Sequence, residues 1–228
     1  MTVGTPLQPP RQGRHHKSGW FIPAALLAIS FIPLLAGALR VVQLAASPAI
    51  TPENARFVVA PIPVVLHILS ALIFCVLGAF QFLPSLRRRK PRWHRMSGRL
   101  VVTSGLLVAF SGLWMTLYYP AGVESLAKFD GPALYAIRLL AGSTMALLLC
   151  LGIAAILRRD IPQHRAWMMR GYAVGLGAGT QAFTHLPWFI FTSIQGELAR
   201  TLCMAAGWVI NLAVAEWIIA RENDGQVA

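Results

Sequence analysis

Four ionisable side chains, Arg40, His67, Arg138 and His185, lie inside long apolar runs of the sequence. Each lies about five to seven residues from the end of its run that is expected on the outer side of the membrane. This places all four in one layer roughly 8–10 Å below the outer surface. Ionisable groups at such depth are costly and usually face a bundle interior or a wet cavity. Two histidines and two arginines in one layer therefore predict a buried polar site.

A simpler interpretation of the same residues stays open. Arg40 and Arg138 could extend outward to lipid head groups, and His67 and His185 could be neutral core residues that hydrogen-bond to carbonyl groups. For each residue alone this interpretation is the better one. The shared depth of all four is what favours a site.

A second group of histidines and arginines lies near the opposite ends of two runs. The segments PRWHRMSGR and IPQHRAWMMR each place a His-Arg pair shortly after a proline, and a further arginine follows about one helical turn later. These residues are His94, Arg95, Arg99, His164, Arg165 and Arg170. They predict either a belt of side chains at the head groups or a paired histidine site whose arginines hold an anion, since helix N-termini also attract phosphate.

The elements that must position these side chains are apolar runs of twenty or more residues. The chain is 56% hydrophobic and only 12% charged, and such runs are typical of transmembrane helices. They span residues 20–45, 61–84, 96–119, 132–157, 166–192 and 200–220. Backbone inside lipid must satisfy its own hydrogen bonds, so we expect an all-α integral membrane protein with a bundle of six transmembrane helices.

The distribution of lysine and arginine predicts the orientation of this bundle. Thirteen of these residues lie in the tails and loops of one side, and two, Arg56 and Lys128, lie in the loops of the other. The positive-inside rule then places both termini in the cytoplasm. We expect a disordered cytoplasmic tail over residues 1–19, a transmembrane domain over 20–220 and a cytoplasmic tail over 221–228. The net charge of +12 reflects this topology and contact with anionic lipid, and it does not indicate nucleic-acid binding.

Small residues mark two of the predicted helices as interior. Ser-Gly pairs recur every seven residues at 97–98, 104–105 and 111–112, and glycines recur every four at 171, 175 and 179. Small residues at such spacing allow helices to pack closely in a membrane. We therefore expect close helix contacts at Gly105 and Gly175.

Several positions carry a family resemblance. They are His67, Gly78, the pairs Gln81-Phe82, His94-Arg95 and Gly98-Arg99, and the run HRAWMMR at 164–170. Over roughly residues 60–195 the chain resembles an uncharacterised bacterial family of predicted membrane proteins, a domain of unknown function. The resemblance implies a multi-pass protein of the bacterial cytoplasmic (inner) membrane. A looser likeness is to two-haem membrane cytochromes, which implies an outer haem pair at His67 and His185 and an inner pair at His94 and His164.

Two main functional hypotheses follow. In the first, the protein binds b-type haem and carries electrons to or from a redox partner or a quinone. Neutral His67 and His185 are then the axial ligands of the iron, and Arg40 and Arg138 pair with the haem propionates. Because His164 and His185 are 21 residues apart on one predicted helix, one haem fits better than two. In the second, the same arginines bind a small anion or a lipid head group. A metal site other than haem iron ranks lower, since no carboxylate or thiol completes its ligands. No nucleophile motif identifies an enzyme.

Overall fold

The computed structural model describes residues 19–119 and 127–227, and every regular element in these ranges is a helix. Five helices are long and apolar enough to cross a membrane, which confirms the predicted all-α membrane protein. They are α1 (Phe21–Ala45), α3 (Pro61–Gln81), α5 (Pro91–Tyr118), α6 (Pro132–Leu157) and α10 (Glu197–Val227). Shorter elements connect them: α2 (Ala55–Val59), α4 (Pro84–Arg89), and the 3₁₀ turns η1 (Ala127–Phe129) and η2 (Thr192–Ile194).

The fifth predicted span, residues 166–192, differs from the other five. Here the chain forms three consecutive shorter helices, α7 (Ile161–Gly175), α8 (Gly177–Thr184) and α9 (Leu186–Ile190). The first interruption falls at Leu176, between two glycines, where helix propensity is low. The second falls at His185, two residues before Pro187, which lies in the first turn of α9 and cannot donate a backbone hydrogen bond. The six-span topology therefore stays a prediction.

Proline begins most of the helices after α1. It stands at the first or second position of α3, α4, α5, α6, α7 and α9, where its fixed φ angle suits a helix and its missing N–H is not needed. On α7, the Asp160 side chain also accepts a hydrogen bond of 3.0 Å from the backbone N–H of Gln163. These residues set where α5 and α7 begin, and they thereby place His94 and His164 in the first turns of those two helices.

The core is built around Phe74, which is 1% exposed. A Cβ added at Gly105 would lie 2.6 Å from the Phe74 ring, and one added at Gly175 would lie 2.5 Å from it. The predicted close contacts at both glycines are thus confirmed. Tyr172 packs on Phe74 with ring centroids 5.2 Å apart, and its hydroxyl donates to the Cys75 carbonyl at 3.0 Å.

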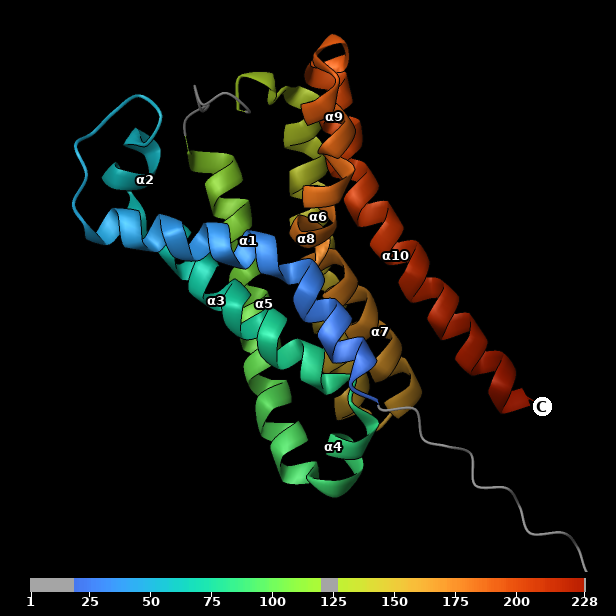
Figure 1. Cartoon of the computed structure of the whole chain (residues 1–228). Coiled ribbons are helices and arrows are strands. Elements are labelled where there is room, and N and C mark those ends of the chain that lie inside the picture. Colours follow the sequence, from blue (N-terminus) through green and yellow to red (C-terminus); the bar gives the residue numbers. More distant parts are fainter. Residues whose placement is uncertain (1–18, 120–126, 228) are drawn as a thin grey trace, which may run out of the picture.

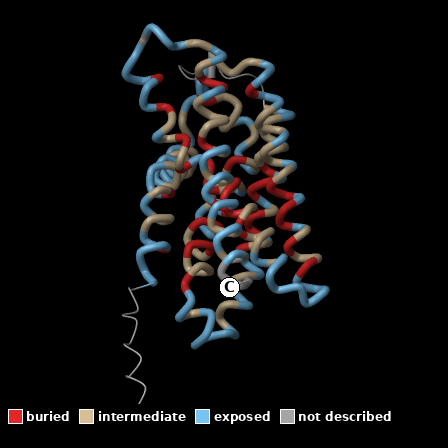
Figure 2. Tube along the Cα trace, turned by 90° about the vertical axis from the view of Figure 1, so that its right-hand side faces the viewer, coloured by how far each residue is buried: buried red, intermediate tan, exposed pale blue. Residues whose placement is uncertain are grey.

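The helices around this core are arranged as a bundle with two less buried members (Figure 1). Helices α3, α5, α6 and α7 pack side by side, α1 lies across α3 and α8, and α10 slants away from the bundle toward the C-terminus. Figure 2 shows that the buried residues gather in the middle of the bundle. In Figure 1 the start of α1 and the end of α10 lie toward the end that carries α4. We refer to this end as the inner end and to the opposite one, with η1 and α9, as the outer end.

The predicted tails differ in how much of them is described. Residues 1–18 lie outside the described residues, so the expected disorder of residues 1–19 stays a prediction. At the other terminus, α10 continues to Val227, so the segment expected as a tail over 221–228 is helical as far as it is described.

Candidate functional site

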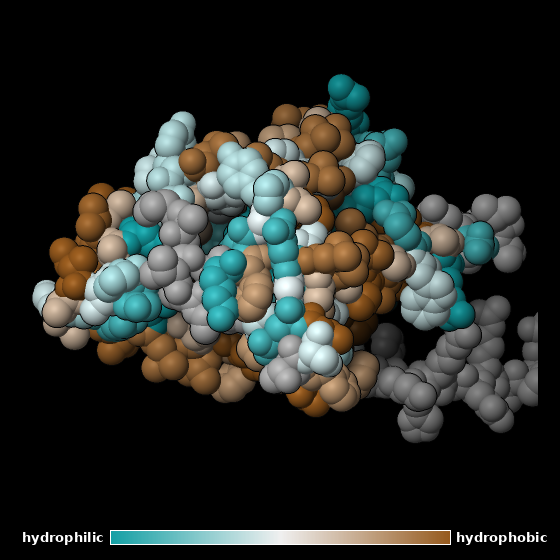
Figure 3. Space-filling model, turned by 90° about the horizontal axis from the view of Figure 1, so that it is seen from above, coloured by the Kyte–Doolittle hydropathy of each residue, from teal (hydrophilic) through white to brown (hydrophobic). Residues whose placement is uncertain are grey.

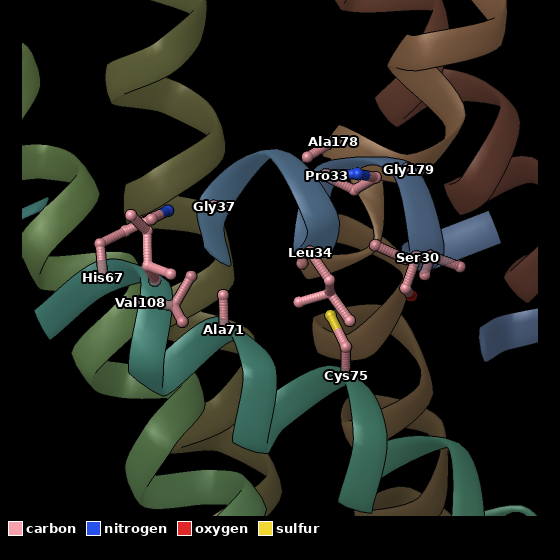
Figure 4. A pocket seen from close by; sticks show the side chains of 13 residues that line it. Ser30, Pro33, Leu34, Gly37, His67, Ala71, Cys75, Val108, Ala178 and Gly179 are labelled. Atoms are coloured by element: carbon pink, nitrogen blue, oxygen red, sulfur yellow. The ribbon is translucent and has the colours of Figure 1, made fainter. Parts of the chain in front are cut away.

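The four residues of the predicted outer layer do not share one cavity. His67 lines a cavity of about 120 Å³ between α1, α3, α5, α7 and α8, and neither His185 nor either arginine lines it. Figure 4 shows His67 at one end of this cavity, near Gly37, with Ser30 and Cys75 at the other end. Most of the lining is apolar. A cavity of this size is smaller than the roughly 300 Å³ and more that pockets for organic ligands occupy.

Hydrogen bonds fix the ring of His67 in this position. Its Nδ1 lies 3.0 Å from the hydroxyl of Ser111, which itself donates to the Leu107 carbonyl at 2.5 Å. The serine hydroxyl therefore accepts from His67, and Nδ1 carries the proton. In a neutral ring this leaves the lone pair on Nε2.

Arg40 lies apart from the other three residues. Its guanidinium donates to the Gln43 side chain at 2.9 Å, and its Cζ lies 4.5 Å from the centre of the Phe57 ring. Both contacts keep Arg40 on the side of α1 and α2. The structure thus does not bring Arg40 to the histidines.

Arg138 belongs to an ion-pair cluster that the sequence did not reveal. Its Nη1 donates to Oδ2 of Asp130 at 2.7 Å, while Nε of Arg200 donates to Oδ1 of the same carboxylate at 2.5 Å. Arg200 is 7% exposed and interacts electrostatically with His185. Arg138 and His185 are therefore linked through Asp130 and Arg200 at the outer end, where Figure 3 shows hydrophilic side chains near the centre and hydrophobic ones around them.

Asp130 and Arg200 carried a signal that sequence analysis could have used. Asp130 directly precedes Gly131 and Pro132 at the start of a predicted span, and Arg200 occupies the first position of another. An acid in a chain with eight acids in all, next to a span that holds Arg138, is a natural partner for that arginine.

The inner end brings the second predicted group together. His94 on α5 interacts electrostatically with His164 on α7, and also with Arg95 and with Arg87 of α4. All of these groups are basic. The His164 Nδ1 lies 2.8 Å from the carbonyl oxygen of Gly152, so it carries the proton and the lone pair of the neutral ring is on Nε2.

Two of the predicted arginines already have acidic partners on α10. Arg170 binds Glu216 through Nε and Nη2 at 2.5 and 2.8 Å. Arg165 forms a salt bridge with Glu222. These contacts attach the inner half of α10 to α7.

Three further arginines at the inner end lack the acidic partners that Arg165 and Arg170 have. They are Arg87, Arg95 and Arg99. Within the part of the chain that the structure describes, none of the three forms a salt bridge. Partial burial and the neighbouring charges of Arg165 and Arg88 lower the pKa of Arg87, and the opposite charge of Glu222 offsets part of this effect. An arginine keeps its charge at neutral pH even so, so the inner end holds positive charge in excess.

Metal binding by protein side chains alone has no candidate among the described residues, since no three His, Cys, Asp or Glu side chains gather there. The histidines in the described ranges are placed singly or as the His94 and His164 pair. The arrangement at the inner end can bind a ligand that brings negative charge, or one that brings its own metal between two imidazoles.

Comparison with known proteins identifies a family to which the chain is similar. Residues 64–219 match the family model described as Predicted membrane protein (DUF2306). No curated protein and no solved structure matches the chain. The matched range runs from α3 into α10 and includes both His-Arg pairs, and because it covers more than half of the chain, this protein belongs to the DUF2306 family of predicted membrane proteins.

Proposed function

We propose that this membrane protein binds a phosphate-bearing anion, either a lipid head group or a soluble phosphate ester, at its inner end between α4, α5 and α7. The observation that carries the proposal is the surroundings of His94. Every charged or titratable group that interacts with it, Arg87, Arg95 and His164, is basic. Like charges held together repel, and an anion bound among them removes that repulsion.

One helix end supports the same ligand. His94 lies in the first turns of α5, which has no side-chain cap, and the free N–H groups and the helix dipole favour negative charge there. At the start of α7, near His164, the Asp160 carboxylate already caps the helix. Arginine binds phosphate through two parallel N–H groups. Arg95, which has no salt bridge among the described residues, is free to do so.

This proposal places the anion at the inner end and not in the outer layer. Arg138 shares the carboxylate of Asp130 with Arg200, which offsets much of its charge. Arg40 lies on the far side of α1 with Gln43 and Phe57. Neither arginine therefore supports the outer anion site as well as the basic residues around His94 support the inner one.

The test uses the purified full chain in phosphatidylcholine nanodiscs, titrated with dihexanoyl phosphatidic acid and with inorganic phosphate in a calorimeter. Arg95→Gln is expected to weaken binding about tenfold, the effect of losing a charge-assisted hydrogen bond. Arg92→Gln removes the same charge three residues away and serves as the matched control. Tighter binding of the phospholipid than of phosphate identifies a head-group site, whereas equal loss in both variants would show that only the surface charge matters.

A second candidate function, b-type haem binding, is favoured by the tautomer of His164. In His67, His164 and His185, Nδ1 is hydrogen-bonded to an oxygen that accepts. This leaves Nε2 as the nitrogen that can ligate iron, which is the usual arrangement of metal-binding histidines. Because His67 and His185 share no cavity, the pair that remains for an iron is His94 and His164.

The absorption spectrum of the protein, produced in cells supplied with haem, separates the two candidates. Haem between His94 and His164 would give a Soret band that His164→Ala abolishes and His67→Ala leaves unchanged. A spectrum without a Soret band excludes the second candidate and leaves the anion site as it stands.

A further inference from the structure

Three buried polar atoms at the outer end have no hydrogen-bond partner among the described residues. They are Nε2 of His185, Nε1 of Trp188 and Oγ1 of Thr201. The three residues are 6%, 4% and 4% exposed, respectively. Buried polar atoms are nearly always hydrogen-bonded, because leaving one without a partner costs the free energy of removing it from water. Three at one end of the molecule therefore indicate that something else binds them.

The three atoms come from segments that meet at one place. His185 and Trp188 lie one turn apart at the junction of α8 and α9. The Trp188 ring packs against Phe129 with centroids 5.4 Å apart, and Asp130, the next residue along the chain, binds Arg200. Thr201 follows Arg200 on α10, and Arg200 interacts with His185. The junction, η1 and α10 thus surround one buried polar region.

The hydrogen-bonding character of these atoms restricts the ligand. The His185 Nδ1 lies 2.8 Å from the Gln181 carbonyl, so in the neutral ring Nε2 is an acceptor. The indole nitrogen of Trp188 can only donate, and the hydroxyl of Thr201 can do either. A hydroxyl group satisfies both rings at once, since it donates to His185 and accepts from Trp188. A fully ionised phosphate or carboxylate offers acceptors alone and would leave neutral His185 without a donor.

The surface beside this region is mostly apolar. Its exposed side chains on α9 and the first turns of α10 include Leu186, Phe189, Ile190, Leu198 and Leu202, with Glu197 as the charged exception. In a membrane protein such a surface faces lipid. A ligand that enters from the bilayer must itself be largely apolar.

We propose that the junction of α8 and α9, with η1 and the start of α10, binds the hydroxyl head group of a lipid-soluble molecule. His185 accepts from the hydroxyl, and Trp188 donates to it. This site is separate from the anion site of the inner end and does not depend on it. The hydroxyl could belong to an aromatic ring, as in a hydroquinone, or to an aliphatic chain.

The test measures binding of decyl hydroquinone to the full-length protein in detergent by calorimetry under argon. Its dimethyl ether is the matched ligand, because it keeps the ring, the tail and the acceptor oxygens but has no hydroxyl to donate. The parent protein is expected to bind the hydroquinone about tenfold more tightly than the ether. Decanol and its methyl ether form a second pair, and the same preference there shows that an aliphatic hydroxyl also suffices.

Variants assign the preference to the site. His185→Phe and Trp188→Phe should each abolish it, while Trp217→Phe, a change on an exposed residue of α10, should retain it. Trp188→Phe keeps an aromatic ring in place, so it decides the matter if His185→Phe does not fold. Equal binding of hydroquinone and ether by the parent, or an unchanged preference in Trp188→Phe, would overturn the proposal and show that water satisfies these atoms.

Discussion

Arg200 on α10 and Asp130 before α6 are seventy residues apart in the chain, yet Nε of the arginine lies 2.5 Å from Oδ1 of the aspartate. The Arg200 side chain is 8% exposed and that of Asp130 is 20% exposed. Arg138 binds the other carboxylate oxygen at 2.7 Å. One acidic side chain thus connects α6 with the outer end of α10.

Asp130→Asn is therefore expected to destabilise the protein substantially. Removing one partner of a buried ion pair leaves the other charge buried without compensation, at a cost of about 3 kcal/mol in the free energy of unfolding. Denaturation in detergent measures this loss. Asp160→Asn is the matched control, since asparagine also caps helices well. If Asp130→Asn is no less stable than Asp160→Asn, the cluster does not hold α10.

A double variant distinguishes the ion pair from other effects of the substitution. Asp130→Asn combined with Arg200→Gln removes both charges and should recover part of the lost stability. A double variant as unstable as the sum of the two single variants would show that the residues do not depend on each other.

Gly105→Ala should destabilise the bundle, because the added Cβ would lie 2.6 Å from Phe74 and 2.8 Å from Leu149. Overpacking of this kind costs about 1–3 kcal/mol. At Gly196 a Cβ meets nothing within 4 Å, so Gly196→Ala should leave the melting temperature nearly unchanged. The pair of variants is compared by thermal denaturation in one detergent. Equal melting temperatures for the two variants would contradict the close contact at Gly105.

The predicted orientation places Lys90 in the cytoplasm and Lys128 outside. Thirteen basic residues of the tails and loops lie on the side of Lys90, and two on the side of Lys128, which is a strong bias. In a chain whose native cysteines are replaced by alanine, Lys128→Cys should react with a membrane-impermeant maleimide added to intact cells. Lys90→Cys should react only after the cells are opened. Labelling of Lys90→Cys in intact cells would reverse the topology.

Much of the fold was predictable because hydropathy and length determine where a helix can cross a membrane. Five predicted spans became single helices. The remaining span, residues 166–192, contains Gly175, Gly177 and Pro187, and their effect on helix continuity outweighed its apolar character. The small-residue spacing correctly located the interior contacts at Gly105 and Gly175, because only glycine allows Phe74 so close to the backbone.

The site was harder to predict, because depth along a helix says nothing about the direction in which a side chain points. His67 and His185 were expected at one level, but His67 faces Ser111 while His185 is near Arg200. The direction depends on which helices are neighbours, and no periodic pattern in the sequence records that. The inner pair was easier to find, since His94 and His164 follow helix-starting prolines by three and two residues, respectively.

Ser111→Ala tests the protonation that is assigned to His67. Ser104 and Ser111 lie two turns apart on α5, and each donates to a backbone carbonyl one turn earlier, but only Ser111 also contacts a histidine. Ser104→Ala is thus a close control. Ser111→Ala removes the hydroxyl that accepts from Nδ1–H of His67, so it should cost about 1–2 kcal/mol more than Ser104→Ala.

Nitrogen NMR of the histidine rings reads the same effect directly. In the parent protein, His67 should show a protonated Nδ1 and an unprotonated Nε2, because the serine hydroxyl uses its own proton on the Leu107 carbonyl. In Ser111→Ala this preference should weaken, since the neutral ring then loses the serine hydroxyl and keeps only the backbone of Val108 as a local acceptor. In Ser104→Ala it should persist. A His67 with its proton on Nε2 in the parent would contradict the assigned donor, and with it the availability of Nε2 as a ligand toward the cavity of α1 and α3.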